Sequence, residues 1–239
     1  MTLATATAAD ERLAPADRLA LLCDPGSFAP LRSRATTRAA GVASRAGDGV
    51  LAGAGRVGGR PVFCFAEDPG FMGGSLGEAH ADSIVRVLEL ARRAGRPVVG
   101  FVESAGARLQ EGHAALAGYG RIFRATVELA AVSPQIAVVT GVSAGGGAYA
   151  PALTDFLVMT EGARMFLTGP RVVREALGET VTMAELGGPH VHARNGVCEV
   201  VADSDDQAAD RARALLALLP DRIGERPPMG APFEAAGEP

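Results

Sequence analysis

The chain has 239 residues, a formal net charge of −4, and a composition that is 48% hydrophobic, 21% charged and 5% aromatic. Such a composition is typical of a globular protein rather than a disordered or fibrous one, and the length favours a single domain of moderate size. The charge excludes a basic surface that would attract nucleic acid or an anionic membrane, so we expect neither as a partner.

Hydrophobic periodicity and turn residues predict the elements of an α/β fold. In chain order they are a helix over 8–23, an irregular arm over 29–49, strands over 50–57 and 61–66, a helix over 75–94, a strand over 97–102, a helix over 110–132, a strand over 135–142, a short helix over 148–153, strands over 156–160 and 165–167, and a helix over 204–219. Ser75, Thr182 and Ser204 each begin an S/T-x-x-E/Q capping box. The continuous apolar strands predict a sheet that is buried on both faces.

The polar composition excludes several kinds of chemistry. All 23 basic residues are arginine, so a Schiff-base lysine and the lysine of a phosphate-binding P-loop are excluded. The three cysteines, Cys23, Cys64 and Cys198, lie far apart in the sequence, which favours buried thiols in a reducing compartment over a zinc site or a disulfide framework. Because the first residues show no signal peptide, we expect a cytoplasmic location.

Three turns rich in small residues follow three predicted strands and precede helices. They are Phe71–Ser75, Ser104–Arg108 and Ser143–Gly147. Glycine lets a backbone approach a ligand closely, and the first turn of a helix presents free N–H groups at its positive end. Such turns suit an oxyanion or a phosphate, although glycine can also serve only to make a tight crossing between a strand and a helix.

Other candidate sites compete with this interpretation. Residues 141–145 fit the G-x-S-x-G nucleophile elbow of the α/β-hydrolases, with Ser143 as the nucleophile and Asp155 and then His190 or His192 in the permitted order. The two histidines could also form a metal pair, but no third ligand stands at a useful spacing, so a loop histidine pair is favoured. The arginines of the 29–49 arm could meet phosphates or could face solvent or a subunit.

At these turns the sequence resembles the N-terminal domain of the carboxyltransferase (β) subunit of biotin-dependent acyl-CoA carboxylases, of the propionyl-CoA and acetyl-CoA carboxylase type. The matching stretches are ADRLALLCDPGSF (16–28), GDGVLAGAGRVGGRPV (47–62), FMGGSLGE (71–78), SAGARLQEG (104–112), LAGYGRIF (116–123), GGGAYAPALTDF (145–156), FLTGPRVV (166–173) and VTMAELGGPHVHARNGV (181–197). They keep the family's order and spacing over about residues 10–225.

The resemblance implies a crotonase-like (ClpP/crotonase) superhelix of ββα units in a single domain over residues 1–225, followed by a loose tail at 226–239. In that family the active site lies between the N-domain of one chain and the C-domain of another. By resemblance, the peptide N–H groups that stabilise an enolate or biotin oxyanion belong to Gly145 and Gly146. The residues implied to bind substrate or line the pocket are Phe71, Gly73, Gly74, Ser75, Ala105, Gly106, Ala107, Arg108, Gly118, Tyr119, Gly169 and Pro170.

The resemblance also implies the cofactor and the partners. Biotin would be carried on a separate protein, an acyl-CoA would be the substrate, and this chain would bind no metal. A C-domain-like chain, a biotin carboxylase and the biotin carrier protein would be partners in a hetero- or homo-oligomer. Since the chain ends at Pro239, near the family's domain boundary, we expect another polypeptide to supply the C-domain. Fixed dipoles can stabilise a thioester enolate without a metal or a nucleophilic side chain.

The sequence departs from the family pattern at several positions. Ala105 replaces a glycine, Ser83 stands where a lysine is common, Asn195 replaces a small residue, and Ser143 stands where the family often has cysteine. These departures leave two alternatives beside the carboxyltransferase. One is a biotin-independent decarboxylase of malonyl or methylmalonyl thioesters, and the other is a non-catalytic paralogue that acts as an interaction subunit.

Overall fold

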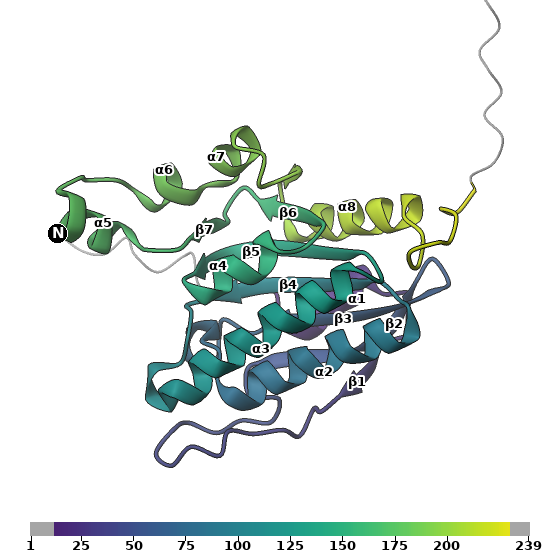
Figure 1. Cartoon of the computed structure of the whole chain (residues 1–239), viewed down its shortest axis with the longest axis horizontal. Coiled ribbons are helices and arrows are strands. Elements are labelled where there is room, and N and C mark those ends of the chain that lie inside the picture. The colour runs from purple at the N-terminus through teal and green to yellow at the C-terminus, as the bar shows by residue number, and fades with distance from the viewer. Residues whose placement is uncertain (1–11, 230–239) are drawn as a thin grey trace, which may run out of the picture.

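One mixed sheet organises the molecule, and the computed structural model describes residues 12–229. The strands run in the order β1-β2-β3-β4-β5-β6-β8, and β7 pairs with the far half of β5 (Figure 1). The antiparallel part consists of β1 (Ala29–Leu31), β2 (Val50–Val57) and β3 (Arg60–Glu67). The parallel part continues from β3 through β4 (Val98–Ser104), β5 (Gln135–Ala144), β6 (Phe156–Thr160), β7 (Arg164–Phe166) and β8 (Val200–Ala202).

Helices cover both faces of this sheet. They are α1 (Pro15–Leu22), α2 (Glu78–Ala94), α3 (His113–Ala130), α4 (Gly146–Ala152), α5 (Pro170–Leu177), α6 (Met183–Gly187), α7 (Pro189–Arg194) and α8 (Asp205–Leu218), with short 3₁₀ turns η1 (Met72–Gly74) and η2 (Leu109–Glu111). Helices α2 and α3 pack together on one face, and α1 and α8 lie together on the other (Figure 1). The segment from α5 to α7 extends beyond one end of the sheet.

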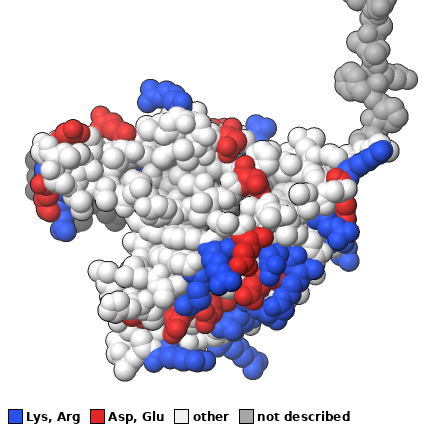
Figure 2. Space-filling model, in the orientation of Figure 1, with Lys and Arg blue, Asp and Glu red and all other residues white. Residues whose placement is uncertain are grey.

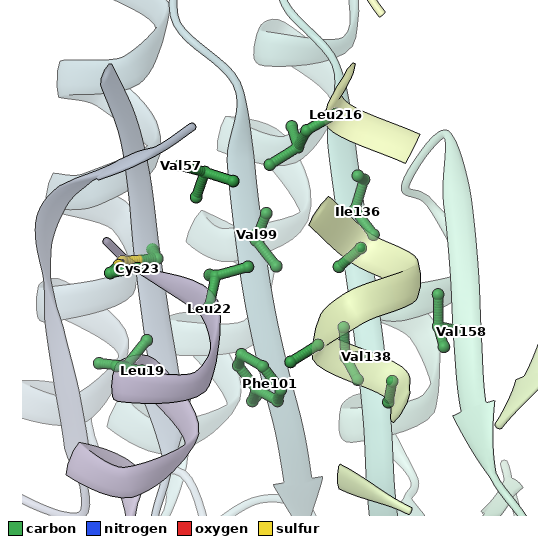
Figure 3. Packing of buried hydrophobic residues seen from close by; sticks show 14 of the residues in the cluster. Leu19, Leu22, Cys23, Val57, Val99, Phe101, Ile136, Val138, Val158 and Leu216 are labelled. Carbon is green, nitrogen blue, oxygen red and sulfur yellow. The ribbon is translucent and has the colours of Figure 1, made fainter. Parts of the chain in front are cut away.

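The core shows why the central strands are apolar throughout. Every residue of β4 is buried, because helices lie against both faces of the sheet. Val99 and Phe101 point toward α1 and α8, beside Leu22 and Leu216 (Figure 3). Val98 belongs instead to the cluster beneath α2 and α3. The prediction of an α/β fold with a sheet buried on both faces is therefore confirmed.

The elements missed by the sequence pattern are short or carry no core face. Strands β1 and β8 have three residues each, which is too few to show a period of two. Helix α5 has no buried residue, so no apolar stripe faces the sheet. Helix α7 carries the histidines that were expected in a loop. The predicted helix over 8–23 corresponds to α1, which begins only at Pro15; residues 12–14 are not helical, and residues 8–11 lie outside the described residues.

The three predicted capping boxes have different outcomes. Thr182 forms the complete reciprocal box with Glu185. Ser204 accepts from the amide of Gln207, but the side chain of Gln207 accepts from Asp203 instead of reaching back to the cap. The box at Ser75 is wrong, because α2 begins three residues later, after Gly77. The amide of the first helical residue, Glu78, donates to the carboxylate of Glu111, which comes from the next turn along the chain.

Two of the cysteines come together although they are distant in sequence. Cys23 caps the C-terminus of α1 and Cys64 lies on β3, with their sulfur atoms 3.8 Å apart. Both are free thiols in the core, as is Cys198. Gly55 makes room for this pair, since a Cβ there would lie 2.7 Å from the sulfur of Cys23. The prediction of buried thiols is confirmed.

Candidate functional site

Three turns meet at one edge of the sheet because the parallel strands β3, β4 and β5 all end there. The amide of Ala105 donates to the carbonyl of Gly73 at 3.1 Å, and the amide of Leu76 donates to the carbonyl of Gly106 at 2.9 Å. A Cβ on Gly106 would lie 3.2 Å from the carbonyl oxygen of Ala144. The three predicted turns therefore form one continuous surface of backbone, at the edge where parallel sheets place their ligands.

The N-terminus of α4 presents free amides at this surface. Gly145 adopts φ 58° and ψ −124°, and its own N–H donates to the carbonyl of Phe166 at 3.1 Å. Gly146 is the first residue of α4, so its N–H has no acceptor within the helix. No group in residues 12–229 accepts a hydrogen bond from it. Of the predicted pair, Gly146 offers a free donor, whereas Gly145 shapes the turn.

Tyr119 explains why residue 146 has no side chain. The tyrosine lies on α3, and a Cβ on Gly146 would lie 2.7 Å from its ring. On the same helix, a Cβ on Gly118 would lie 2.7 Å from the Cβ of Ala81, so Gly118 allows α2 and α3 to pack closely. Gly120 has open space beside it. Tyr119 therefore lies at the candidate site, whereas Gly118 serves the contact between the two helices.

Arg108 is a structural residue and not a surface that a substrate could touch. Its side chain is fully buried, and its Nη1 donates to Asp48 at 2.7 Å and to Glu111 at 2.9 Å. Its Nη2 donates to the carbonyl of Ser75 at 2.9 Å. We correct the sequence-based assignment accordingly: Arg108 holds the first turn against the second. Ser75 takes part through its backbone.

The first turn requires glycine because of its backbone geometry and its close packing. Gly73 and Gly74 adopt φ values of 65° and 69°, and a Cβ on Gly74 would lie 2.1 Å from the carbonyl oxygen of Glu103. The guanidinium groups of Arg45 and Arg108 lie over the ring of Phe71. Their Cζ atoms are 4.4 Å and 5.4 Å, respectively, from the centroid of the ring. Phe71 thus packs the first turn against Arg45 and Arg108.

Ala105, the departure from the family pattern, fits without strain. It has no positive φ, and its methyl group lies 3.6 Å from the position that a Cβ would take on Gly73. The residue is exposed at the edge of the site, and Ala107 pairs with Leu76 in an isolated bridge. At the second departure, the buried hydroxyl of Ser83 donates to the carbonyl of Ala79. Neither departure disrupts the turns.

Gly169 and Pro170 lie apart from the three turns. They begin α5, with Gly169 at the N-cap and Pro170 at the first helical position. A Cβ on Gly169 would lie 3.7 Å from the ring of Phe166, the residue whose carbonyl accepts from Gly145. Gly169 is therefore linked to the third turn only indirectly, through Phe166 on β7.

The alternative sites fail on geometry. Ser143 is fully buried, and its hydroxyl has no hydrogen-bond partner among the described residues. His190 pairs with Glu161, His192 bonds the carbonyl of Met165, and the carboxylate of Asp155 accepts from the amide of Gln135. These side chains do not form a Ser-His-Asp set. Residues 12–229 also contain no group of three or more His, Cys, Asp or Glu side chains that could hold a metal.

Sequence reasoning missed two acidic residues whose buried carboxylates hold the turns in place through hydrogen bonds. Asp48 is fully buried at φ 52° and accepts from both Arg108 and the amide of His80. Glu111 accepts from Arg108, from Glu78 and from Thr37. The spacing of three residues between Arg108 and Glu111 was a signal that could have been used.

The surface beside the site is largely uncharged. Figure 2 shows that acidic and basic side chains gather over α2 and α3 and are scattered along the segment from α5 to α7, whereas the area over α4 is mostly free of them. Tyr149 on α4, Leu153 directly after α4 and Leu167 after β7 are exposed apolar residues. No helix among the described residues is both long and apolar enough to span a membrane.

Comparisons with known proteins place this arrangement in a family. A family model described as the carboxyl transferase domain matches residues 7–238. The biotin-dependent acetyl-/propionyl-coenzyme A carboxylase beta5 subunit of Mycobacterium leprae is 45% identical over 210 residues, which are 85% of this chain and 38% of that protein. The transcarboxylase 12S structure with hydrolysed methylmalonyl-coenzyme A bound has a TM-score of 0.90 and 41% identity over 93% of this chain and 45% of that chain.

A further likeness is to a shorter chain. One chain of the Pseudomonas malonate decarboxylase hetero-tetramer in complex with malonate aligns with a TM-score of 0.81 and 28% identity, over 87% of this chain and 83% of that chain. The chain spans about two fifths of the length of the curated carboxylase and carboxyltransferase relatives that it matches. These likenesses and the mixed sheet confirm the expected crotonase-like fold. The chain therefore belongs to the carboxyl transferase domain family.

Proposed function

We propose that the chain is the N-domain-type carboxyltransferase component of an acyl-CoA carboxylase. It would take part in moving a carboxyl group between carboxybiotin and the α-carbon of an acyl-CoA. The observation that carries the proposal is the free amide of Gly146, at the N-terminus of α4 and beside two other glycine turns. The names of the carboxylase and transcarboxylase relatives support the reaction class.

The chemistry requires stabilisation of a negative oxygen. Removing a proton from the α-carbon of a thioester, or releasing an α-carboxylate as CO2 so that its bonding electrons stay behind, leaves an enolate whose oxygen carries the charge. A preorganised N–H group aimed at that oxygen strengthens its interaction as the charge develops, and therefore lowers the barrier. The helix dipole of α4 adds to the same effect, because its positive end lies at Gly146.

Open space beside the third turn supports biotin as the carboxyl donor. A Cβ on Gly145 would meet nothing within 4 Å, so the space beside the turn is open to a bound group. When bound, carboxybiotin would supply the carboxyl group. Gly146 would hold the oxyanion, Gly73 and Gly106 would give the acyl-CoA a close backbone surface, and the ring of Tyr119 would support Gly146 from beneath.

We further propose that a C-domain-like chain completes the site, together with a biotin carboxylase and a separate biotin carrier protein. The uncharged surface over α4, with exposed Tyr149 and Leu153, supports a protein partner next to the site. The relatives named as subunits, and the hexamer named for transcarboxylase 12S, support an oligomer.

A second candidate is a decarboxylase of malonyl or methylmalonyl thioesters that does not use biotin. One observation favours it: the malonate decarboxylase chain is matched over 83% of its length. The Gly146 amide would stabilise the oxyanion in this reaction too, because decarboxylation passes through the same enolate.

The variant Gly146→Val tests the site in either reaction. Wild type and variant would be supplied with methylmalonyl-CoA, biotin and a C-domain-like chain, and the decarboxylated CoA product would be followed by mass spectrometry. We expect the variant to fold and to lose turnover, because a branched side chain would displace the amide. Full activity in Gly146→Val would refute the assignment of the oxyanion donor.

A further inference from the structure

Ser104 ends β4 and places its hydroxyl at the centre of the three turns. The oxygen donates to the carbonyl of Gly74 at 2.8 Å and accepts from the amide of Gly106 at 3.3 Å. It also lies 3.1 Å from the hydroxyl oxygen of Tyr119. Ser104 is fully buried, so no substrate can reach it. One side chain thus bonds the first turn, the second turn and α3.

Counting donors assigns the direction of the bond to Tyr119. A serine hydroxyl has one hydrogen and can accept two hydrogen bonds. The carbonyl of Gly74 can only accept, so it takes the hydrogen of Ser104. The amide of Gly106 can only donate, so it takes one acceptor position. The hydroxyl of Tyr119 must then donate to the remaining acceptor position of the Ser104 oxygen. Burial, with a smaller contribution from the charge of Glu67, raises the pKa of Tyr119, so the phenol keeps the proton that it donates.

The same pair of side chains contacts the third turn. The ring of Tyr119 lies 2.7 Å from where a Cβ of Gly146 would be, and a Cβ on Gly147 would lie 3.0 Å from the Cβ of Ser104. The first two residues of α4 therefore rest on Tyr119 and Ser104. Any shift of these side chains moves the backbone that carries the Gly146 amide.

We propose that Ser104 is a positioning residue: its hydroxyl holds the first two turns in one geometry and, through Tyr119, sets the place of the Gly146 amide in the third. The inference rests on the proposed function for its catalytic consequence, because it concerns the same site. An amide that must meet a developing charge tolerates little displacement, and a misplacement of about 1 Å can lower a rate about a hundredfold. The hydroxyl acts on this geometry and not on the substrate.

The test compares two variants that remove different parts of the network. Ser104→Ala removes all three hydrogen bonds and leaves the carbonyl of Gly74 and the amide of Gly106 without this partner. We expect kcat to fall about tenfold to a hundredfold, with KM for the acyl-CoA changed less than about threefold. Tyr119→Phe removes one bond and keeps the ring against Gly146, so we expect a fall in kcat of about threefold to tenfold.

Ser133→Ala is the matched control. Ser133 is also buried, but its hydroxyl has no hydrogen-bond partner among residues 12–229, and it lies between α3 and β5 at the opposite end of β5 from the third turn. Its removal should change neither kcat nor KM. A fall in kcat equal to that of Ser104→Ala would show that loss of any buried serine has this effect, and would overturn the inference.

A second measurement does not depend on the reaction. Glycine labelled with ¹⁵N reports the amides of Gly106 and Gly146 by NMR, in the whole chain. In Ser104→Ala and in Tyr119→Phe we expect the Gly146 resonance to shift, while Ser133→Ala leaves it in place. An unchanged Gly146 resonance in both variants would overturn the inference. If wild type turns over no acyl-CoA while these shifts occur, the proposed function fails and the positioning of the amide stands. If Ser104→Ala does not fold, Tyr119→Phe gives the same two outcomes.

Discussion

Two glycine-to-alanine substitutions, at Gly146 and at Gly120, separate the packing of the site from the general cost of glycine in a helix. Both residues lie in helices and neither has a positive φ. At Gly146 the new Cβ would lie 2.7 Å from the ring of Tyr119, whereas at Gly120 it would meet nothing within 4 Å. We therefore expect the same substitution to lower the free energy of unfolding at Gly146 and to raise it at Gly120.

The structure sets the size of each effect. The ring of Tyr119 is held by the bond of its hydroxyl to Ser104, so the clash at Gly146 must be relieved by movement of α4. Overpacking of this kind costs about 1–3 kcal/mol, which lowers Tm by about 2–12 °C in a chain of this size. Alanine at Gly120 should instead stabilise the helix by about 0.5–1 kcal/mol and raise Tm by about 1–4 °C.

Thermal unfolding followed by circular dichroism measures both shifts under one set of conditions. Turnover of methylmalonyl-CoA with the completing partner should fall in Gly146→Ala and stay at the wild-type level in Gly120→Ala. If Gly146→Ala unfolded at the temperature of Gly120→Ala, Tyr119 could not be packed against α4, and the reason given for the glycine would be wrong.

Three further predictions concern the residues around the turns. Arg108→Met should destabilise the fold by about 3–5 kcal/mol in urea unfolding, because Asp48 is left as a buried charge; an effect below about 1 kcal/mol would contradict a buried ion pair. Burial raises the pKa of Glu111, but its hydrogen bonds, led by the one from the amide of Glu78, outweigh this and leave the pKa below its usual value. Its stabilising contribution is therefore present above its ordinary pKa of 4.5 and is lost as the pH falls through the lower folded value. Glu111→Gln should therefore lose stability at pH 7, and its difference from wild type should shrink as the pH falls below 4.5, as a series of unfolding measurements across that range would show. Ser143→Ala should retain turnover of acyl-CoA, and its inactivation would restore a nucleophilic role for that serine.

Much of the fold could be predicted because its signals are local. The apolar run at 98–102 and the periodic residues Ile84, Val87, Leu88 and Ala91 each report a buried face directly. Glycine-rich turns after β3, β4 and β5 were visible as sequence, and a parallel sheet necessarily brings such turns to one edge. The edge of the sheet that carries the candidate site was therefore predictable.

The details of the site depended on contacts between distant residues. Nothing local shows that Arg108 is buried against Asp48, 60 residues away, or that the cap of α2 comes from Glu111 instead of Ser75. The bond from Gly145 to Phe166 likewise arises only when β7 pairs with β5. Sequence identified the glycines, and only the structure shows that the amide of Gly145 is engaged whereas that of Gly146 is free.

The most direct test of the proposed function runs the reaction toward loss of the carboxyl group. The purified chain would be incubated with methylmalonyl-CoA, with and without free biotin and with and without a C-domain-like chain, and the decarboxylated CoA product would be followed by mass spectrometry. The account predicts product only when biotin is present, and more of it when the completing chain is added. Product formed equally without biotin would contradict carboxyl transfer and establish the decarboxylase, and absence of product in every tube would contradict both enzymatic functions.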